Sequence, residues 1–143
     1  MKNTLRHLII VFALVIVSCN SKTEGQVPEA VKKTFQSKYP GETDPDWRKD
    51  KNGNYESHFK KDGEHYRADF SPNGDWIETE CNIKKKELPK AVKAALKASH
   101  GDVEIVEIEK VDHVTKGVFY DVEIKIDGEK QDIEFTKEGK RIN

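Results

Sequence analysis

Two segments of the chain carry apolar residues at every fourth position, and this spacing predicts two amphipathic helices. Pro28 and Pro89 stand near the start of these segments, where the first turn of a helix tolerates proline. Gly41 and Gly101 follow the segments and end the helical pattern. The apolar stripes consist of Val27, Val31, Phe35 and Tyr39 in the first segment and of Leu88, Val92 and Leu96 in the second.

Strand patterns separated by tight turns follow each helical segment. The dipeptides Asn52-Gly53, Asp62-Gly63 and Asp127-Gly128 favour two-residue hairpins, because their residues accept a positive φ. In the first half of the chain we expect strands over 46–51, 55–61, 64–71 and 75–82. In the second half we expect about four more.

The two halves of the chain resemble each other, which predicts an internal repeat. Val27–Lys32 recurs as Leu88–Lys93, and a series from Tyr55 to Ile77 recurs from Tyr120 to Ile142. We therefore expect an α+β domain over 27–143, made of repeat one (27–87) and repeat two (88–143). Each repeat would place one helix on about four antiparallel strands, and the two would join into one sheet of roughly eight strands with both helices on one face.

The hairpin dipeptides also predict the register of the strands. A two-residue loop at Asp62-Gly63 places Phe59 opposite Tyr66 and Tyr55 opposite Phe70. The loop at Asp127-Gly128 places Tyr120 opposite Phe135 in the same way. Because a Tyr–Phe pair recurs at the same node, we interpret this face of the sheet as the core and the other face as polar.

The polar face contains a candidate protein-binding surface formed by Trp76, His58, Arg67 and Glu78. Trp76 matches Arg141 in the repeat, while its neighbour Ile77 matches the apolar Ile142, so Trp76 is expected to point outward. An exposed tryptophan among charged side chains is typical of a binding anchor. The alternative is that Trp76 covers the end of the hairpin or packs against Trp47.

The same face contains a candidate acidic patch, in which Asp121 faces Glu134 and Glu123 faces Asp132. Carboxylates directly opposite each other cost stability, so this arrangement suggests a basic protein partner or a divalent cation. The alternative is solvated carboxylates relieved by nearby lysines and arginines. We expect no metal site, because regular strands present carboxylates too flatly to wrap Ca²⁺ and the histidines lack the spacing of metal ligands.

Residues 1–18 have the plan of a lipoprotein signal peptide: two cations, an apolar run over 8–17, and Ser18 before Cys19. Ten apolar residues are too few to span a bilayer of roughly 30 Å. The segment Ile16–Cys19 resembles the bacterial lipobox, which implies lipid attachment at Cys19 and a tether over 19–26. Asn20 after the cysteine implies transport to an outer membrane. The alternative is an ordinary signal peptide that ends near a cysteine.

Composition excludes several classes of function. Of 25 basic side chains, Lys2 and Arg6 belong to the signal, which leaves 23 against 26 acidic ones, a net charge of about −3. This balance argues against nucleic acid as a partner. With Cys19 lipidated, Cys81 has no cysteine to pair with, and we expect it to be a small buried core residue. Motifs for catalysis or for a cofactor are missing from the sequence, so we expect no enzyme and no cofactor.

A set of motif residues is concentrated in the first repeat: 27–31, Phe35, Tyr39-Pro40, Trp47, Tyr55, Phe59, Asp62-Gly63 and Phe70–Gly74. With these residues the chain resembles, over about 27–143, the PepSY-like, β-lactamase-inhibitor-like envelope proteins. This resemblance implies two helix-on-sheet units that form a concave sheet surface. PepSY domains accompany secreted peptidases as inhibitory modules, which suggests a hydrolase as partner by analogy. We therefore expect a non-enzymatic, lipid-anchored envelope protein that binds another protein; the alternative is a periplasmic lipoprotein that binds a cation or small ligand. Repeat two departs from the family pattern over 106–117.

Overall fold

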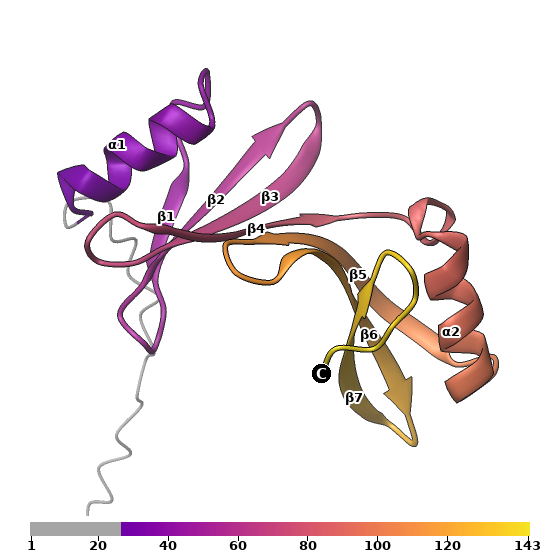
Figure 1. Cartoon of the computed structure of the whole chain (residues 1–143). Coiled ribbons are helices and arrows are strands. Elements are labelled where there is room, and N and C mark those ends of the chain that lie inside the picture. The colour runs from indigo at the N-terminus through magenta and orange to yellow at the C-terminus, as the bar shows by residue number, and fades with distance from the viewer. Residues whose placement is uncertain (1–26) are drawn as a thin grey trace, which may run out of the picture.

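Seven antiparallel strands pair in chain order in the computed structural model, which describes residues 27–143 (Figure 1). The helices are α1 (Glu29–Lys38) and α2 (Lys90–His100), with a short 3₁₀ helix η1 (Lys85–Glu87) before α2. The strands are β1 (Asp46–Lys49), β2 (Tyr55–Lys61), β3 (Glu64–Phe70), β4 (Trp76–Asn82), β5 (Glu104–His113), β6 (Gly117–Ile126) and β7 (Glu129–Thr136).

The predicted α+β class, both helices and the hairpin registers at Asp62-Gly63 and Asp127-Gly128 are confirmed. The two-residue hairpin expected at Asn52-Gly53 is wrong, because Lys49 pairs with Tyr55 and residues 50–54 form a longer loop. Tyr55 pairs with Phe70 and Tyr120 pairs with Phe135. Asp62 and Asp127 take φ angles of 53° and 51°, as tight two-residue hairpins require. The registers follow from these turns, because a two-residue loop leaves no freedom in the pairing.

The expected count of about eight strands is wrong, because the described part of the sheet has seven. In place of an eighth strand the chain makes an isolated bridge between Phe135 and Arg141. Beyond this bridge the edge of β7 is satisfied by a 3.0 Å backbone hydrogen bond from Ile142 N to Glu134 O and by the side chain of Asn143. The Asn143 amide accepts a hydrogen bond from Glu134 N and donates one to Asp132 O, each 3.0 Å long.

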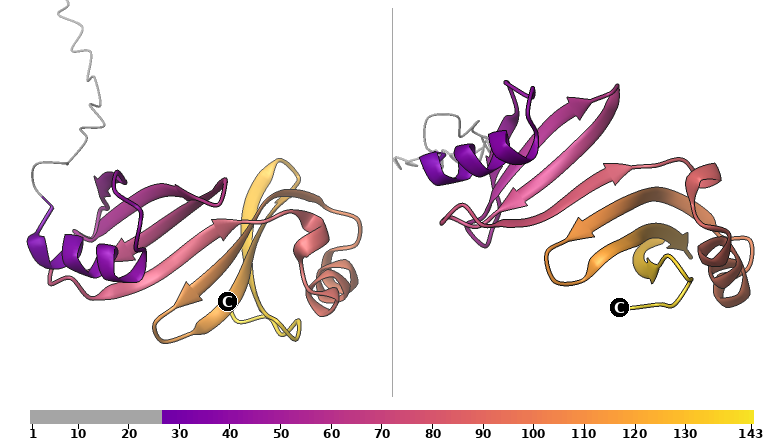
Figure 2. Two further views of the ribbon diagram at one scale, coloured as in Figure 1. Left: turned by 90° about the horizontal axis from the view of Figure 1, so that it is seen from above. Right: turned by 45° about the horizontal axis from the view of Figure 1, so that its top comes forward.

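Each helix packs on the strands of its own half of the chain (Figure 2). The α1 core is aromatic: the Phe35 ring lies 5.2 Å from Phe59 and 5.4 Å from Trp47 between centroids, both edge-to-face. The α2 core is mainly aliphatic, with Val92, Val122, Ile124 and Ile133 at its centre, and it also contains the Tyr120–Phe135 pair.

Two glycines set the distance between helix and sheet. A Cβ on Gly74 would lie 2.7 Å from the Ala30 carbonyl carbon, and one on Gly139 would lie 2.6 Å from the Ala91 oxygen. Both glycines also have positive φ angles, 91° and 84°. A side chain at either position would therefore push the helix away from the turn that follows β3 or β7.

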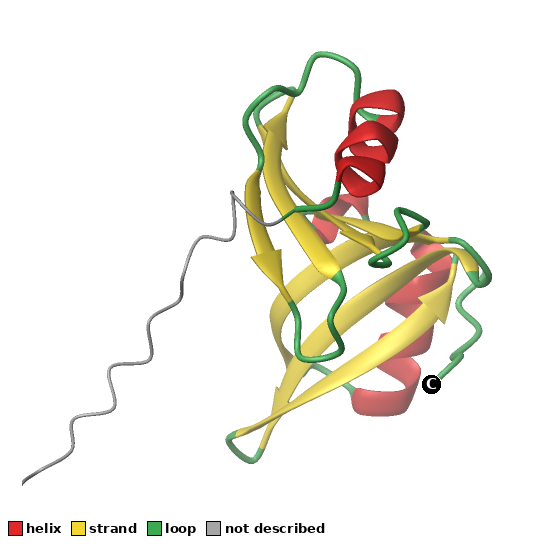
Figure 3. Ribbon diagram, turned by 90° about the vertical axis from the view of Figure 1, so that its left-hand side faces the viewer, coloured by secondary structure: helices red, strands yellow, loops and turns green. Residues whose placement is uncertain are grey.

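Both helices lie on the same face of the sheet (Figure 3). Tyr66, Cys81, Lys110 and Tyr120 are neighbours across β3 to β6, so they share one face, and this face continues into both cores. We call the other side the helix-free face, because neither α1 nor α2 covers it. Among residues 27–143, no helix is long and apolar enough to cross a membrane.

Candidate functional site: the acidic helix-free face

Carboxylates dominate the helix-free face. Strand pairing aligns them in rows, because side chains that are direct neighbours across strands point the same way. In the first half Glu56, Asp69 and Glu78 form one row, and His58, Arg67 and Glu80 form the next. In the second half the rows are Glu109, Asp121 and Glu134, and Glu107, Glu123 and Asp132.

Arg67 lies at the centre of the first-half rows. Its Nη2 atom is 2.6 Å from Glu80 Oε1, 3.5 Å from Asp69 Oδ2 and 3.9 Å from Glu78 Oε1. The carboxylate side chains are only 10% exposed for Glu80 and 14% for Asp69. Within the described residues, Arg67 Nε, Glu80 Oε2 and Asp69 Oδ1 are buried without a hydrogen-bond partner. One guanidinium therefore serves three carboxylates and leaves some of their polar atoms unsatisfied.

Burial perturbs the acidity of this cluster. It raises the pKa of Glu80 to about 8 and the pKa of Asp69 to about 7, against the opposing effect of Arg67. Neighbouring carboxylates act in the same direction as burial: Glu109 on Glu80, and Glu56 on Asp69. The cluster therefore changes its charge near neutral pH, where ordinary carboxyl groups are fully ionised.

The second-half rows contain the acidic patch expected from the sequence. Asp121 pairs with Glu134 and Glu123 pairs with Asp132, as predicted. Burial, together with Asp132 and Glu134, raises the pKa of Asp121 to about 6. Two lysines relieve part of the repulsion. Lys116 Nζ lies 2.7 Å from Glu134 Oε2, and Lys130 Nζ lies 2.7 Å from Glu123 Oε1.

Two apolar residues on this face were missed by the sequence reasoning. Val111 pairs with Glu80 on one side and Phe119 on the other, so all three point to the helix-free face. Val111 is 2% exposed and Phe119 is 3% exposed, although neither helix covers them. Alternation from the core residue Tyr120 puts Phe119 on the polar face, but the sequence does not show that Phe119 and Val111 are buried there. Their burial, with that of Glu80, shows that the middle of this face is sheltered from solvent.

The described residues offer no metal centre: no group of three or more His, Cys, Asp or Glu side chains among them could hold an ion. Lys116 and Lys130 occupy two of the carboxylates that a cation would need.

The predicted outward orientation of Trp76 is wrong. The register shifts between Asp69 and Phe70, so that Phe70 pairs with Trp76 on the helix-bearing face. A one-residue shift moves a side chain to the opposite face of a sheet. Trp76 is half-buried against the α1 core, its Nε1 donates a 2.9 Å hydrogen bond to Thr79 Oγ1, and Lys38 Nζ lies 3.4 Å from the ring centroid.

The other members of that predicted surface do lie together. His58 is directly opposite Arg67, and Arg67 approaches Glu78 on the helix-free face. Trp76 therefore belongs to a different surface from His58, Arg67 and Glu78.

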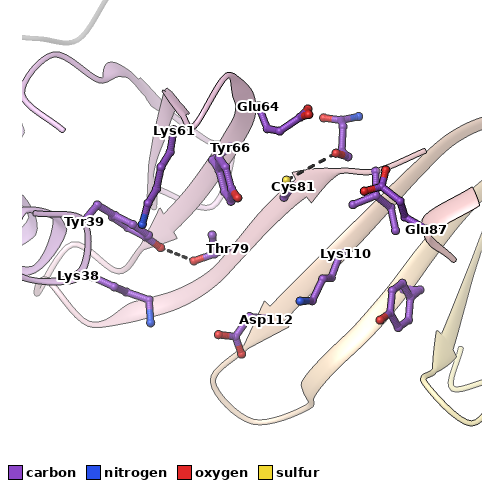
Figure 4. A pocket seen from close by; sticks show the side chains of 13 residues that line it. Lys38, Tyr39, Lys61, Glu64, Tyr66, Thr79, Cys81, Glu87, Lys110 and Asp112 are labelled. Carbon is purple, nitrogen blue, oxygen red and sulfur yellow. Dashed lines mark hydrogen bonds between the residues drawn. The ribbon is translucent and has the colours of Figure 1, made fainter. Parts of the chain in front are cut away.

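Cys81 is half-buried, not a core residue as expected, and it lines a groove on the helix-bearing face (Figure 4). The groove has a volume of about 620 Å³ and lies between α1 and η1, where neither helix covers β4 and β5. Tyr39 and Thr79, joined by a hydrogen bond, form part of its wall. Its charged lining is mixed: Lys38, Lys61 and Lys110 against Glu64, Glu87 and Asp112.

An antiparallel sheet with both helices on one face and a charged, uncovered opposite face defines an α+β protein of the β-lactamase-inhibitor-like class. The family model described as "Putative beta-lactamase-inhibitor-like, PepSY-like" matches residues 53–143, and the chain belongs to this family. Among curated proteins, none matches the sequence.

Solved structures of similar fold come from Bacteroides. A "putative periplasmic" protein of Bacteroides eggerthii is 24% identical, with a TM-score of 0.74 over 83% of this chain and 88% of that one. A BLIP-like protein of Bacteroides fragilis is 21% identical, with a TM-score of 0.73 over 86% of this chain and 89% of that one. At these identities the likeness concerns the fold.

Proposed function

We propose that this protein is a lipid-anchored module of the cell envelope that binds a basic protein surface through its helix-free face. The observation that carries the proposal is the cluster around Arg67, where carboxylates are buried with too few cations. Burying a carboxylate without full pairing is costly, and a partner's lysines or arginines would supply the missing charge. By analogy with the family, we propose a secreted hydrolase as the partner.

The location rests on the N-terminal sequence. Residues 1–18 as a signal peptide and Cys19 as the lipidated residue lie outside the described residues and remain predictions. A periplasmic description of the Bacteroides eggerthii protein is in line with an envelope location. In the outer membrane, the domain would face either the periplasm or the cell surface.

The test is affinity capture from an envelope extract with matched charge-reversal variants. Glu78→Lys with Glu134→Lys changes one half-buried position in each half of the helix-free face. Glu29→Lys with Glu138→Lys makes the same change in charge at two exposed positions outside this face. We expect the first pair to lose the partner and the second to retain it, with far-UV circular dichroism reporting folding. An identical set of bound proteins for wild type and the first pair would overturn the proposal.

A second candidate, small-ligand binding, is favoured by the groove between α1 and η1, whose volume suits a small molecule. A panel of envelope metabolites would be screened by thermal shift, with Thr79→Val and Cys81→Ser as groove variants. Failure of all compounds to raise the melting temperature at millimolar concentration would remove this candidate.

We also infer that the two halves are copies of one ancestral unit. Support comes from the matching contacts of Gly74 with Ala30 and of Gly139 with Ala91, which fall at corresponding positions of the two halves. Duplication would explain why one sheet carries two helices on the same face.

A further inference from the structure

The two helices and the 3₁₀ helix carry a net positive charge, whereas the helix-free face is acidic. Residues 29–38 and 84–100 contain nine lysines and two glutamates. Both helices lie on the same side of the sheet (Figure 3), so the molecule has a basic helical side and an acidic sheet side. The lysines are Lys32, Lys33 and Lys38 in the first segment and Lys84, Lys85, Lys86, Lys90, Lys93 and Lys97 in the second.

The second group, residues 84–97, forms a surface of unusually free cations, which we call the α2 basic surface. Helix α2 has no acidic residue. Lys85, Lys86 and Lys90 are exposed and form no ion pair with any described residue. Lys97 has Asp102 at 3.6 Å, but both side chains are more than 70% exposed, so water screens this pair.

We propose that the α2 basic surface rests on the anionic headgroups of the membrane that holds the lipid anchor, so that the acidic helix-free face points away from the membrane. The proposal takes the anchor at Cys19 from the proposed function and adds an orientation to it. The eight steps from Cys19 to Val27 span at most about 28 Å, so the tether keeps the domain near the bilayer surface. When the tethered domain comes within about one Debye length of the bilayer, roughly 8 Å, electrostatic attraction acts on it. The distribution of charge on the domain then determines which side faces the lipid.

The contact would be electrostatic and reversible. The apolar residues exposed beside the lysines of α2 are alanines, Ala91, Ala94 and Ala98, which offer little apolar area for insertion. Each lysine at an anionic surface contributes about a fivefold gain in binding. Salt should therefore weaken the contact strongly, whereas insertion of apolar side chains would resist salt.

The test uses the chain from Asn20 to Asn143, which keeps every described residue and lacks the lipid site. Sedimentation with vesicles of phosphatidylglycerol and phosphatidylcholine is compared with vesicles of phosphatidylcholine alone. We expect binding to the anionic vesicles only, and at least a tenfold loss between 50 and 500 mM NaCl.

Matched triple variants assign the surface. Lys85→Gln, Lys86→Gln and Lys90→Gln together should weaken vesicle binding at least tenfold. Lys51→Gln, Lys125→Gln and Lys137→Gln remove the same charge from exposed strand ends and turns and should change it less than threefold.

Equal losses in both triple variants, or no binding of the wild-type chain to anionic vesicles, would overturn the proposal. Binding to neutral vesicles would do so as well, and so would association of the chain with itself in place of vesicle binding. The anchor is judged separately, by labelling of Cys19 with radioactive palmitate in cells, so failure on vesicles leaves the proposed function standing.

Discussion

The protein should lose stability as the pH rises from 5 to 8, because the buried carboxyl groups around Arg67 hold their protons more tightly in the folded state. Burial raises the pKa of Asp69 from 3.8 to about 7 and that of Glu80 from 4.5 to about 8. Between the ordinary and the raised pKa the native state binds more protons than the unfolded state. Stability is therefore highest at the acidic end and falls as the pH passes through the raised values.

The magnitude follows from the sizes of the shifts. A shift of one pKa unit corresponds to about 1.4 kcal/mol, so each group alone would contribute about 3 to 4 kcal/mol over this pH range. The two carboxyls share Arg67 and border solvent, which reduces their combined effect. We expect the free energy of unfolding to fall by about 2 to 4 kcal/mol between pH 5 and pH 8.

Urea denaturation at pH 5, 6, 7 and 8, followed by tryptophan fluorescence, measures this change. Glu80→Gln removes one titrating group while keeping its shape, and should reduce the pH dependence by about half. Glu138→Gln, at an exposed turn, should leave it unchanged. A free energy of unfolding that is constant or rises over this range, with the same profile in Glu80→Gln, would refute the reasoning.

Three further predictions concern packing. Gly74→Ala should lower the free energy of unfolding by more than about 2 kcal/mol, because its Cβ would clash with the Ala30 backbone. The control Gly63→Ala is also at positive φ but has no atom within 4 Å of the added Cβ, so it should lower the free energy of unfolding by only about 1 kcal/mol. Similar costs for the two variants in urea denaturation would contradict this. Phe35→Ala should cost about 3 to 5 kcal/mol, because the ring fills the centre of the aromatic core, and a measured cost below about 1 kcal/mol would speak against that core. Trp76→Phe should lower the free energy of unfolding by about 1 kcal/mol, because the hydrogen bond to Thr79 is lost. Partner capture should be unchanged, because Trp76 lies on the helix-bearing face. Loss of the captured partner would show that Trp76 contributes to binding.

Local sequence predicted the hairpins and helices well because each depends on neighbouring residues. Asp62-Gly63 and Asp127-Gly128 determine a turn, and the turn determines the register of everything that follows on both strands. The apolar stripe from Val31 to Phe35 determines which side of α1 meets the sheet.

The position of Trp76 could not be predicted in this way, because it depends on a register shift between β3 and β4. The repeat comparison aligned Trp76 with Arg141. After β3 the chain forms the paired strand β4, which contains Trp76, whereas after β7 it makes only an isolated bridge at Arg141. The burial of Glu80 was unpredictable for a similar reason. Glu80 lies two residues after Glu78 and therefore on the same face, but its burial is created by strands distant in the sequence.

A polar cluster that only stabilises the fold and one that also binds a partner differ in what they predict for partner binding by Glu80→Gln. If the cluster is structural, Glu80→Gln changes the 2.6 Å contact with Arg67 and the pH dependence of stability but leaves partner binding unaffected. If the cluster is a binding surface, its ionised carboxylates are a cost that a cationic partner offsets. Glu80→Gln gains stability relative to wild type as the pH rises from 5 to 8 in either case, but only a binding role predicts that it binds the captured partner more weakly at pH 8. Binding by wild type should also release protons near pH 7, because the partner's cations favour the ionised forms of Asp69 and Glu80. Calorimetry in two buffers of different ionisation enthalpy measures this release, and a heat of binding independent of the buffer would argue for the structural role.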